Sequence, residues 1–377
     1  MTQRLYPDAG SPTVLRSTFE QIGFDLAHEA LRPDYLTSPF ADFEAFSSSV
    51  ARLDPALRLA LQLFSLGESA PSAGVASVLG QDFLEAALAS GLLLLDATGD
   101  HVSTDGLLVS SRLGLYFVVS TNPYYPSFNP NLAEIYLGPE SLTLVNHLQR
   151  RASALASSGH ALDLCAGSGI AGQSVGSIRR GLEWVAVDLS EQAVEAATFN
   201  AMLNGLQGRY SVRTGDLYTP VSGRRFALIV ANPPFIPVPT GVSFPGYGAG
   251  GDDGLAVVRP LLQGIAGRLT DQGRAVIYLE GIGDAHGPFV LNELEELSAK
   301  GYTAGVTLLS TMSSEQALFS MGRLLAAQRP SRLSELVAWQ SSFAAQNVTR
   351  YDKMLVEVRP GSPDVVIRSV TGSPISG

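Results

Sequence analysis

The chain has 377 residues, of which 45% are hydrophobic and 16% charged, with a formal net charge of −10 at pH 7. These proportions predict a soluble protein with room for two domains. No run approaches the ~18–20 apolar residues of a membrane span, and the start lacks the apolar segment of a signal peptide. Cys165 is the single cysteine, which excludes an internal disulfide. We therefore expect a cytoplasmic protein with no membrane partner; nothing in the sequence predicts an oligomeric state.

The negative charge lies almost wholly in the amino-terminal part. Residues 1–150 hold 16 acidic and 7 basic side chains, a net charge of −9, whereas residues 151–377 hold 19 and 18, a net charge of −1. A domain that binds a phosphate backbone is expected to be basic, because neutralising phosphates supplies most of its affinity. The charge therefore disfavours structured RNA as a partner without excluding it.

The amino-terminal part has the pattern of short helices followed by a hairpin. Residues 55–66 and 81–90 have apolar positions at helical spacing, and two short strands, 91–96 and 101–104, flank a turn. Helix, helix and hairpin follow one another in this order in a winged-helix domain. We predict a mainly helical, winged-helix-like domain over residues 1–120, which its charge marks as a structural or partner-binding module.

Residues 120–131 are rich in proline, asparagine and aromatic side chains. Aromatic residues on a stiff loop often form one wall of a pocket. We hypothesise that Tyr124, Tyr125 or Phe128 lines a pocket entrance, with a rigid connector between domains as an equal alternative. Residues 121–150 would then form a connector and a cap.

A strand and a glycine-rich turn are predicted next. Residues 161–165 are apolar except for Asp163 and lead into Ala166-Gly-Ser-Gly-Ile-Ala-Gly172, and Asp188 ends the following apolar run. In nucleotide-binding α/β units such glycines let the backbone approach a ligand, and an acidic residue about 20 positions later binds ribose hydroxyls. The glycine spacing also matches the dinucleotide fingerprint, so an NAD-binding oxidoreductase is an alternative.

Two more polar positions follow apolar runs further along the chain. Asp216 follows residues 210–214, and Asn232-Pro233-Pro234-Phe235 follows residues 226–231. In a doubly wound α/β sheet such strand ends meet at the ligand crevice. Four polar strand ends in succession indicate one site. Asp163, four residues before the first glycine, suits a carboxylate near an amine better than one near a pyrophosphate.

The Asn-Pro-Pro-Phe loop can hold a planar NH2 group. The side-chain oxygen of Asn232 and the carbonyl of Pro233 can each accept one N–H. The prolines stiffen the loop, and Phe235 offers a face for stacking. Orientation of this kind is worth ~7–11 kcal/mol in favourable cases. A simple turn after a buried strand is the alternative.

With these motifs, residues from about 130 to 360 resemble class I S-adenosylmethionine-dependent methyltransferases. Within them they resemble the small-domain amino-methyltransferases, similar to the release-factor glutamine and ribosomal RNA guanine and adenine N-methyltransferases. Gly138-Pro-Glu-Ser-Leu142 and Gly250-Gly-Asp-Asp-Gly-Leu255 with Arg259 add to the likeness. The resemblance implies a doubly wound, seven-stranded, Rossmann-like sheet over residues 151–377. Some actinobacterial-type members carry a fused winged-helix-like segment.

The resemblance also implies the cofactor and the role of each motif. S-adenosyl-L-methionine is the expected cofactor and S-adenosyl-L-homocysteine its product. The cofactor-binding residues would be Asp163, Cys165, Gly167, Gly169, Asp188, Leu189, Asp216, Leu217 and Asn232, and the catalytic residues Asn232, Pro233 and Phe235. Substrate-pocket candidates are Pro234, Tyr124, Tyr125, Phe128 and Tyr247. The five histidines are scattered, so no metal site is expected.

The chain departs from the family pattern at Phe235 and in the interval between its last two predicted strands. Phe235 stands where members often carry tyrosine. The last two predicted strands, residues 302–309 and 353–359, are separated by more than forty residues instead of a tight hairpin. Within that stretch residues 331–343 have helical periodicity and either cover the pocket or pack outside it. The glycine-dense segment 241–250 is the expected lid.

The sequence therefore predicts an N-methyltransferase that acts on a planar nitrogen. A protein or peptide amide and a small metabolite are the expected substrate classes, with a nucleobase amine of ribosomal or transfer RNA as an alternative. A cofactor-sensing regulatory protein is the alternative from a different class.

Overall fold

The computed structural model describes residues 5–6, 10–31, 43–121, 129–328 and 330–370. The chain forms two compact units, and each unit is made of three separate segments of the sequence. The first unit comprises Met1–Pro139, Gly167–Ser177 and Ser190–Val212, and the second comprises Glu140–Ala166, Ile178–Leu189 and Arg213–Gly377. The division at residues 120 and 150 expected from the sequence stays a prediction.

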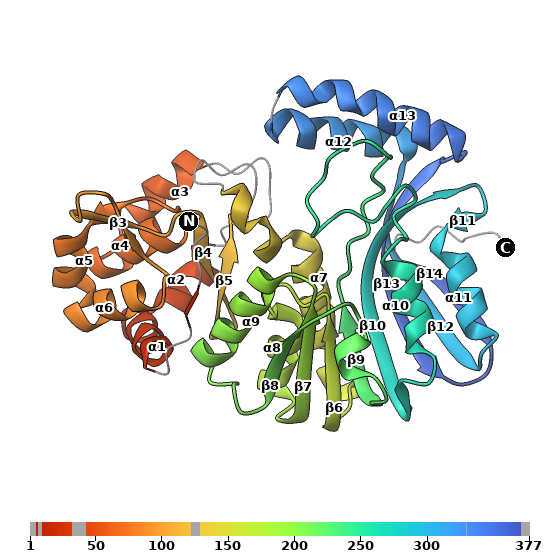
Figure 1. The fold of residues 1–377 in the computed structure, drawn as a ribbon, viewed down its shortest axis with the longest axis horizontal. Coiled ribbons are helices and arrows are strands. Elements are labelled where there is room, and N and C mark those ends of the chain that lie inside the picture. Colours follow the sequence, from red (N-terminus) through yellow and green to blue (C-terminus); the bar gives the residue numbers. More distant parts are fainter. Residues whose placement is uncertain (1–4, 7–9, 32–42, 122–128, 329, 371–377) are drawn as a thin grey trace. The chain divides into compact units, whose positions relative to one another are not determined.

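The amino-terminal elements of the first unit are mainly helical (Figure 1). In chain order they are α1 (Ser11–Ile22), α2 (Phe24–Leu31), α3 (Phe43–Val50), α4 (Pro55–Phe64), β1 (Ala70–Pro71), α5 (Ser72–Leu79), α6 (Gln81–Ala89), β2 (Leu94–Leu95), β3 (His101–Ser103), β4 (Leu107–Arg112), β5 (Leu115–Ser120) and the 3-10 helix η2 (Pro130–Ile135).

An aromatic cluster joins these helices to β5. The ring of Phe19 lies 4.9 Å from that of Phe24, 5.3 Å from that of Phe64, 5.7 Å from that of Phe83 and 5.4 Å from that of Tyr116, between centroids. Such aromatic pairs add to the free energy gained by burying their area. The cluster therefore fixes α1, α2, α4 and α6 around one strand.

The predicted helices 55–66 and 81–90 correspond to α4 and α6, and the predicted hairpin to β2 and β3. Asp54 caps α4 by accepting hydrogen bonds from the backbone of Ala56 and Leu57. The structure adds β1 and α5 between the two helices, and the three short strands pair in the order β1-β3-β2. The winged-helix-like interpretation stays a prediction.

The sheet associated with the second unit has nine strands among the described residues. Their order is β14-β12-β13-β10-β9-β6-β7-β8, and β11 pairs with β10 (Figure 1). The strands are β6 (Ser158–Leu164), β7 (Gly181–Asp188), β8 (Tyr210–Thr214), β9 (Phe226–Ala231), β10 (Leu269–Asp284), β11 (Gly287–Pro288), β12 (Tyr302–Ser313), β13 (Arg350–Pro360) and β14 (Asp364–Ser369).

The predicted doubly wound α/β sheet is confirmed. The strand β6 pairs in parallel with β7 on one side and with β9 on the other. The strand order therefore reverses at β6: β7 and β8 lie on one side of it, and β9 and β10 on the other. Ligand crevices form at such a reversal. The two-residue strand β11 and the edge strand β14, which pairs in parallel with β12, are added to the seven strands expected.

Helices and short 3-10 turns connect the strands. They are α7 (Pro139–Arg150), η3 (Ala152–Ala154), α8 (Ile170–Ile178), α9 (Glu191–Leu203), η4 (Thr219–Val221), α10 (Val258–Ile265) and α11 (Val290–Ser298). The first part of α8 and all of α9 belong to the same compact unit as the amino-terminal elements.

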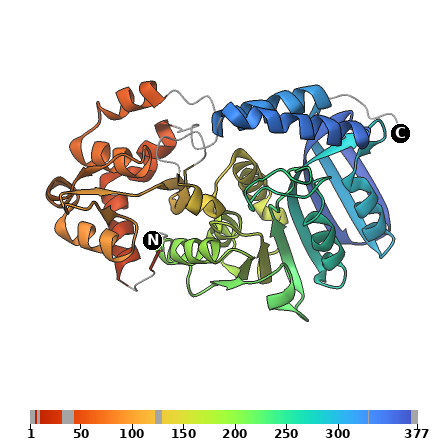
Figure 2. The same ribbon diagram turned by 45° about the horizontal axis from the view of Figure 1, so that its top comes forward.

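A pair of helices fills the interval between β12 and β13. These are α12 (Ser314–Gln328) and α13 (Leu336–Ala345), joined through η5 (Pro330–Glu335), and Figure 2 shows them side by side. The helix expected over residues 331–343 is thus divided between η5 and α13. The strands β12 and β13 nevertheless pair antiparallel, as neighbours in the sheet.

The helix pair packs on the loop that follows β9. Trp339 is fully buried in an apolar cluster with Phe343 and Leu325 of the helix pair and Val238 of the loop. Its indole Nε1–H donates to the carbonyl oxygen of Pro237. The insertion is therefore part of the core of the second unit.

We predict that Trp339→Ala lowers the free energy of unfolding by ~3–5 kcal/mol, because it opens a cavity and leaves the Pro237 carbonyl unpaired. Urea unfolding measures the loss. Val337→Ala is the matched control: Val337 lies on the same helix with 62% of its surface exposed, so its change should stay within ~0.5 kcal/mol. Equal effects of the two variants would contradict the packing described.

Candidate functional site

Three of the predicted site residues lie at the carboxyl ends of neighbouring strands. Asp163 is the penultimate residue of β6, Asp188 the last residue of β7, and Asn232 directly follows β9. The residue after Asp163, Leu164, is in register with Val187 of β7 and Ala231 of β9. The parallel pairing therefore brings these three strand ends to one edge of the sheet.

The electrostatics of Cys165 show that the acidic residues converge. Burial raises the pKa of the Cys165 thiol well above its usual value, and the negative charges of Asp188, Asp163 and Asp216 raise it further. A thiol in such surroundings stays protonated and is a poor nucleophile. The backbone N–H of Gly215 also donates to the carbonyl of Asp188 at 2.9 Å, which ties the Asp216 loop to the end of β7.

The turns after the strands have unusual backbone conformations. Cys165 and Leu217 have positive φ angles of 53° and 44°, which cost energy for residues with a Cβ. Strained backbone of this kind concentrates at functional sites. No sequence pattern indicated these two positions as strained.

The two glycines of the turn differ in their surroundings. Both have positive φ, 54° at Gly167 and 77° at Gly169. A Cβ at Gly167 would meet no atom within 4 Å, whereas one at Gly169 would lie 2.6 Å from Nε2 of Gln173. Gly167 thus leaves open space in which a ligand can approach the backbone, and Gly169 is required by close packing.

Four predicted cofactor contacts are accessible. Asp188 and Leu217 are half-buried and Asp216 is exposed. Leu189 has 74% of its surface exposed although it is apolar. Carboxylates next to exposed apolar side chains fit a ligand with hydroxyl groups and a flat ring, which is what the predicted ribose and adenine contacts require.

Asn232 has one half of its amide fixed and the other half unpaired. Its Nδ2 donates to Oγ of Ser141, near the start of α7, at 3.0 Å. Its Oδ1 is buried and has no hydrogen-bond partner among the described residues. A buried acceptor without a donor costs about 1–3 kcal/mol. The oxygen is therefore positioned to accept an N–H from a bound molecule.

The rest of the loop is rigidly held. Phe235 is buried, with its ring centroid 5.9 Å from that of Tyr278 on β10. The backbone of Ile236 bonds to Gly248 and Gly250, at 2.8 Å each. Pro233 is buried and Pro234 half-buried. Tyr278 is thus one neighbour of the Phe235 ring. The expected stacking of this ring on a substrate stays a prediction.

A polar cluster next to Asn232 was not predicted. Tyr278 and Glu280 are two residues apart on β10, and Lys353 of β13 lies directly across from Glu280. The carboxylate of Glu280 accepts a hydrogen bond from the Tyr278 hydroxyl at 2.7 Å and pairs with Nζ of Lys353 at 3.0 Å. Glu140, the neighbour of Ser141, is close enough to Glu280 for their charges to interact. The pairing of β10 with β13 brings Glu280 and Lys353 together, although they are far apart in the sequence.

The remaining candidates have separate positions. Tyr124, Tyr125 and Phe128 lie outside the described residues. Tyr247 is half-buried in the loop after β9. Arg259, part of the segment that carried the family likeness, pairs with Asp253 and with Glu293, the latter at 2.7 Å. This arginine therefore stabilises the end of that loop.

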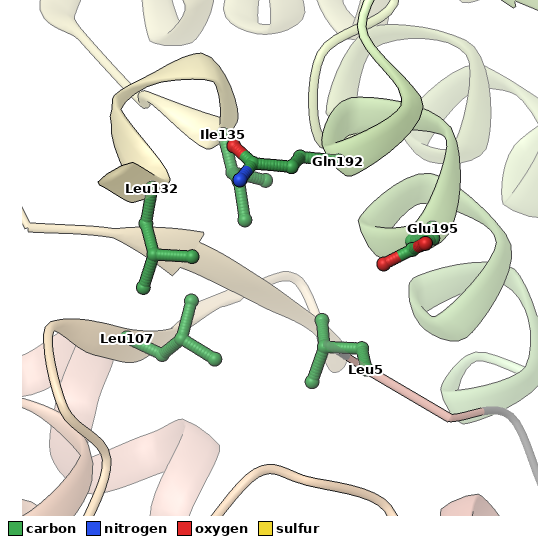
Figure 3. Close-up of a pocket in the computed structure, with 6 residues that line it drawn as sticks. All are labelled: Leu5, Leu107, Leu132, Ile135, Gln192 and Glu195. Carbon is green, nitrogen blue, oxygen red and sulfur yellow. The ribbon is translucent and has the colours of Figure 1, made fainter. Parts of the chain in front are cut away.

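A pocket in the first unit is unrelated to these residues. Figure 3 shows its lining, formed by Leu5, Leu107, Leu132, Ile135, Gln192 and Glu195. Gln192 donates a hydrogen bond to the carbonyl of Asn131 at 2.7 Å. None of the predicted site residues lines this pocket.

Within the described part of the chain, no helix combines the length and the apolar character that crossing a membrane requires.

Comparisons with known proteins bear on the segment that contains the strand ends. Residues 137–239 match the family model of the methyltransferase small domain. This range runs from just before α7 to the loop after β9 and includes Asp163, Asp188, Asp216 and Asn232. The match confirms the predicted resemblance to the small-domain methyltransferases.

Curated relatives match over parts of the chain. The chain is 31% identical over 164 residues to a release factor glutamine methyltransferase of Thermodesulfovibrio yellowstonii, covering 41% of this chain and 57% of that protein. It is 34% identical over 120 residues to a ribosomal protein uL3 glutamine methyltransferase of Bradyrhizobium diazoefficiens, covering 30% and 38%. It is 42% identical over 77 residues to a ribosomal RNA small subunit methyltransferase C of Alcanivorax borkumensis, covering 20% and 22%. The chain thus spans less than two thirds of the length of these relatives.

The polar cluster predicts a pH dependence of stability. Burial and the nearby charge of Glu280 raise the pKa of Glu140 from 4.5 to about 7. Between these values the folded protein retains a proton that the unfolded chain has released, so this group lowers the free energy of unfolding as the pH rises. We expect Glu140→Gln, which cannot ionise, to gain stability relative to the wild type from about pH 4.5 to pH 7 and to keep that gain above pH 7.

Urea unfolding at four pH values between 5 and 8 measures this difference. Glu183→Gln serves as the control, because the Glu183 side chain is 73% exposed. A stability difference between Glu140→Gln and the wild type that stays constant over this range would contradict the prediction.

Proposed function

We propose that this chain, whose residues 137–239 match the methyltransferase small domain, is an S-adenosyl-L-methionine-dependent N-methyltransferase. Its substrate group is a planar amide or amino nitrogen held by the Asn232–Phe235 loop. The observation that carries the proposal is the divided hydrogen bonding of Asn232, with Nδ2 bound to Ser141 and Oδ1 buried without a partner.

The cofactor fits the residues at the strand ends. We assign the methionine part to Asp163 and the turn at Gly167, the ribose to Asp188, and the adenine to Asp216 and Leu217. The convergence of the three carboxylates on Cys165, the open space at Gly167 and the exposed Leu189 support this assignment. When bound, the cofactor supplies a methyl group attached to a positively charged sulfur.

The chain contributes mainly orientation to the reaction. Oδ1 of Asn232 and the carbonyl of Pro233 would accept the two N–H groups of the substrate, which fixes the orientation of the substrate nitrogen. The substrate nitrogen would become positively charged on taking the methyl group that the cofactor supplies, and would then release one proton. No strong base has to act first, because the nitrogen becomes acidic only once it is positively charged.

Protein or peptide amides are the substrate class that we favour. The names of two of the relatives specify glutamine in a release factor and in ribosomal protein uL3. An RNA amino group is the second candidate, supported by the relative named for the small-subunit ribosomal RNA. The net charge of −10 disfavours the RNA candidate. A small metabolite remains the alternative outcome of the same assay.

The proposal also gives a role to the amino-terminal part of the chain. We propose that residues 1–120 form a partner-binding or structural module whose negative charge suits a basic protein partner. Tyr247 and Pro234, both half-buried in the loop after β9, would line the substrate entrance.

We predict that Asn232→Ala loses turnover by ~10²–10³-fold, the loss expected when one oriented hydrogen-bonding group is removed, while its affinity for S-adenosylhomocysteine stays within about threefold. The assay incubates the protein with methyl-labelled S-adenosylmethionine and a cell extract, and separates label in protein, RNA and small molecules. Asn292→Ala, at an exposed asparagine of α11, is the control. Near-normal labelling by Asn232→Ala would overturn the mechanism.

Ser141 should act through Asn232. We expect Ser141→Ala to lower kcat by about tenfold, the effect of ~1.4 kcal/mol, without changing cofactor affinity, because the amide of Asn232 can then rotate. Ser141→Thr keeps the hydroxyl and should restore most of the activity. Equal loss in both variants would indicate a packing role for Ser141 instead of an orienting one.

A further inference from the structure

Two asparagines of α9 bind the edge of β5 that does not pair with β4. One edge of β5 pairs with β4. On the other edge, Oδ1 of Asn200 accepts from the backbone N–H of Val118 at 2.7 Å, and its Nδ2 donates to the Val118 carbonyl at 3.1 Å. Asn204 makes the same pair of bonds with Tyr116, at 2.8 and 2.9 Å. The side chains thus take the place of a neighbouring strand.

The spacing of the two elements explains why this arrangement fits. Residues four apart on a helix are separated by about 6 Å along its axis. Residues two apart on a strand are separated by about 6.6 Å, and their backbone groups point to the same edge. An asparagine amide carries both a donor and an acceptor, as a peptide group does. Asn200 is fully buried and Asn204 is 8% exposed, so these bonds do not compete with water.

Asn200 makes a third bond, to the glycine-rich turn. Its Nδ2 donates to the carbonyl of Ser168 at 2.9 Å, and Ser168 lies between Gly167 and Gly169 with 2% of its surface exposed. Both hydrogens of this Nδ2 therefore have acceptors, one on β5 and one on the turn. The corresponding extra bond of Asn204 goes to Oε1 of Gln173 on α8, at 3.1 Å, and not to the turn.

We propose that Asn200 is a positioning residue for the turn that holds the cofactor, and that β5 sets the conformation of this turn through Asn200. This inference rests on the proposed function, because it takes S-adenosylmethionine as the ligand of the turn. The bond from Val118 fixes the amide of Asn200, and the fixed amide holds the Ser168 carbonyl. A strand that makes no predicted cofactor contact thus contributes to cofactor affinity.

The coupling must act in both directions. If β5 stabilises the ligand-binding conformation of the turn, then a bound ligand stabilises the bonds between Asn200 and β5 by the same free energy. We expect S-adenosylhomocysteine to slow hydrogen exchange at the amides of residues 115–120 of the wild-type protein. The amides of β2 and β3, which make none of these bonds, should change less. Equal slowing of both segments would overturn the proposal, since it would reflect general stabilisation.

A matched pair of variants tests the residue itself. Asn200→Asp and Asn204→Asp each keep an acceptor for β5 and lose the donor, but only Asn200→Asp loses the bond to Ser168. Calorimetric titration with S-adenosylhomocysteine should show about tenfold weaker binding by Asn200→Asp and less than a threefold change for Asn204→Asp. Equal weakening in both variants would overturn the proposal.

The outcomes separate this inference from the proposed function. Failure of the wild-type protein to bind S-adenosylhomocysteine would remove both. Binding by the wild type with no difference between the two variants, or with no added protection of β5, would remove only the role of Asn200. Since the exchange experiment uses the wild type alone, it tests the inference even if a variant fails to fold.

Discussion

The parallel pairing of β6 with β7 and β9 is the constraint on which the candidate site depends. Leu164 faces Val187 on one side and Ala231 on the other, and a slip by one residue would turn Asp163 to the opposite face of the sheet. The register is fixed by the later parts of β6, β7 and β9, which are apolar and buried up to Asp163 and Asp188 near the strand ends. The burial that stabilises these strands is therefore also what sets Asp163 and Asp188 near one edge of the sheet.

Asparagine is used twice in the same way. Asn232 and Asn200 each have a side-chain amide that is held by one set of bonds and offers a further group where orientation matters. Neither residue adds charge to a site that already holds three carboxylates. A neutral amide can aim a donor and an acceptor at once, which suits a reaction whose barrier is lowered mainly by positioning.

The sequence predicted what depends on neighbours along the chain and missed what depends on pairing between distant segments. Polar residues at the ends of apolar runs located Asp163, Asp188 and Asn232, because a strand and the turn after it are local. The cluster of Glu280 with Lys353 requires the register of β10 with β13, more than seventy residues apart. Asn200 lies on α9, where no motif in the sequence indicates that its side chain binds β5. The strand β1 escaped prediction because its two residues carry no periodicity, and the eight-residue helix α5 that follows it was not predicted either.

The insertion between β12 and β13 changes how the loop after Asn232 can move. Segment 241–250 was expected to act as a lid. Bonds of Ile236 to Gly248 and of Val238 to Gly251 tie its carboxyl end to the residues that precede the segment. Its middle is held by α13 and η5, since Phe244 packs on Trp339 and Arg332 donates to the carbonyl of Ser243. These contacts restrain the middle and the carboxyl end of the segment, and its role as a lid stays a prediction. Opening of the segment must therefore break the contacts of Phe244 with Trp339 and of Arg332 with Ser243, or carry the helix pair along with the loop.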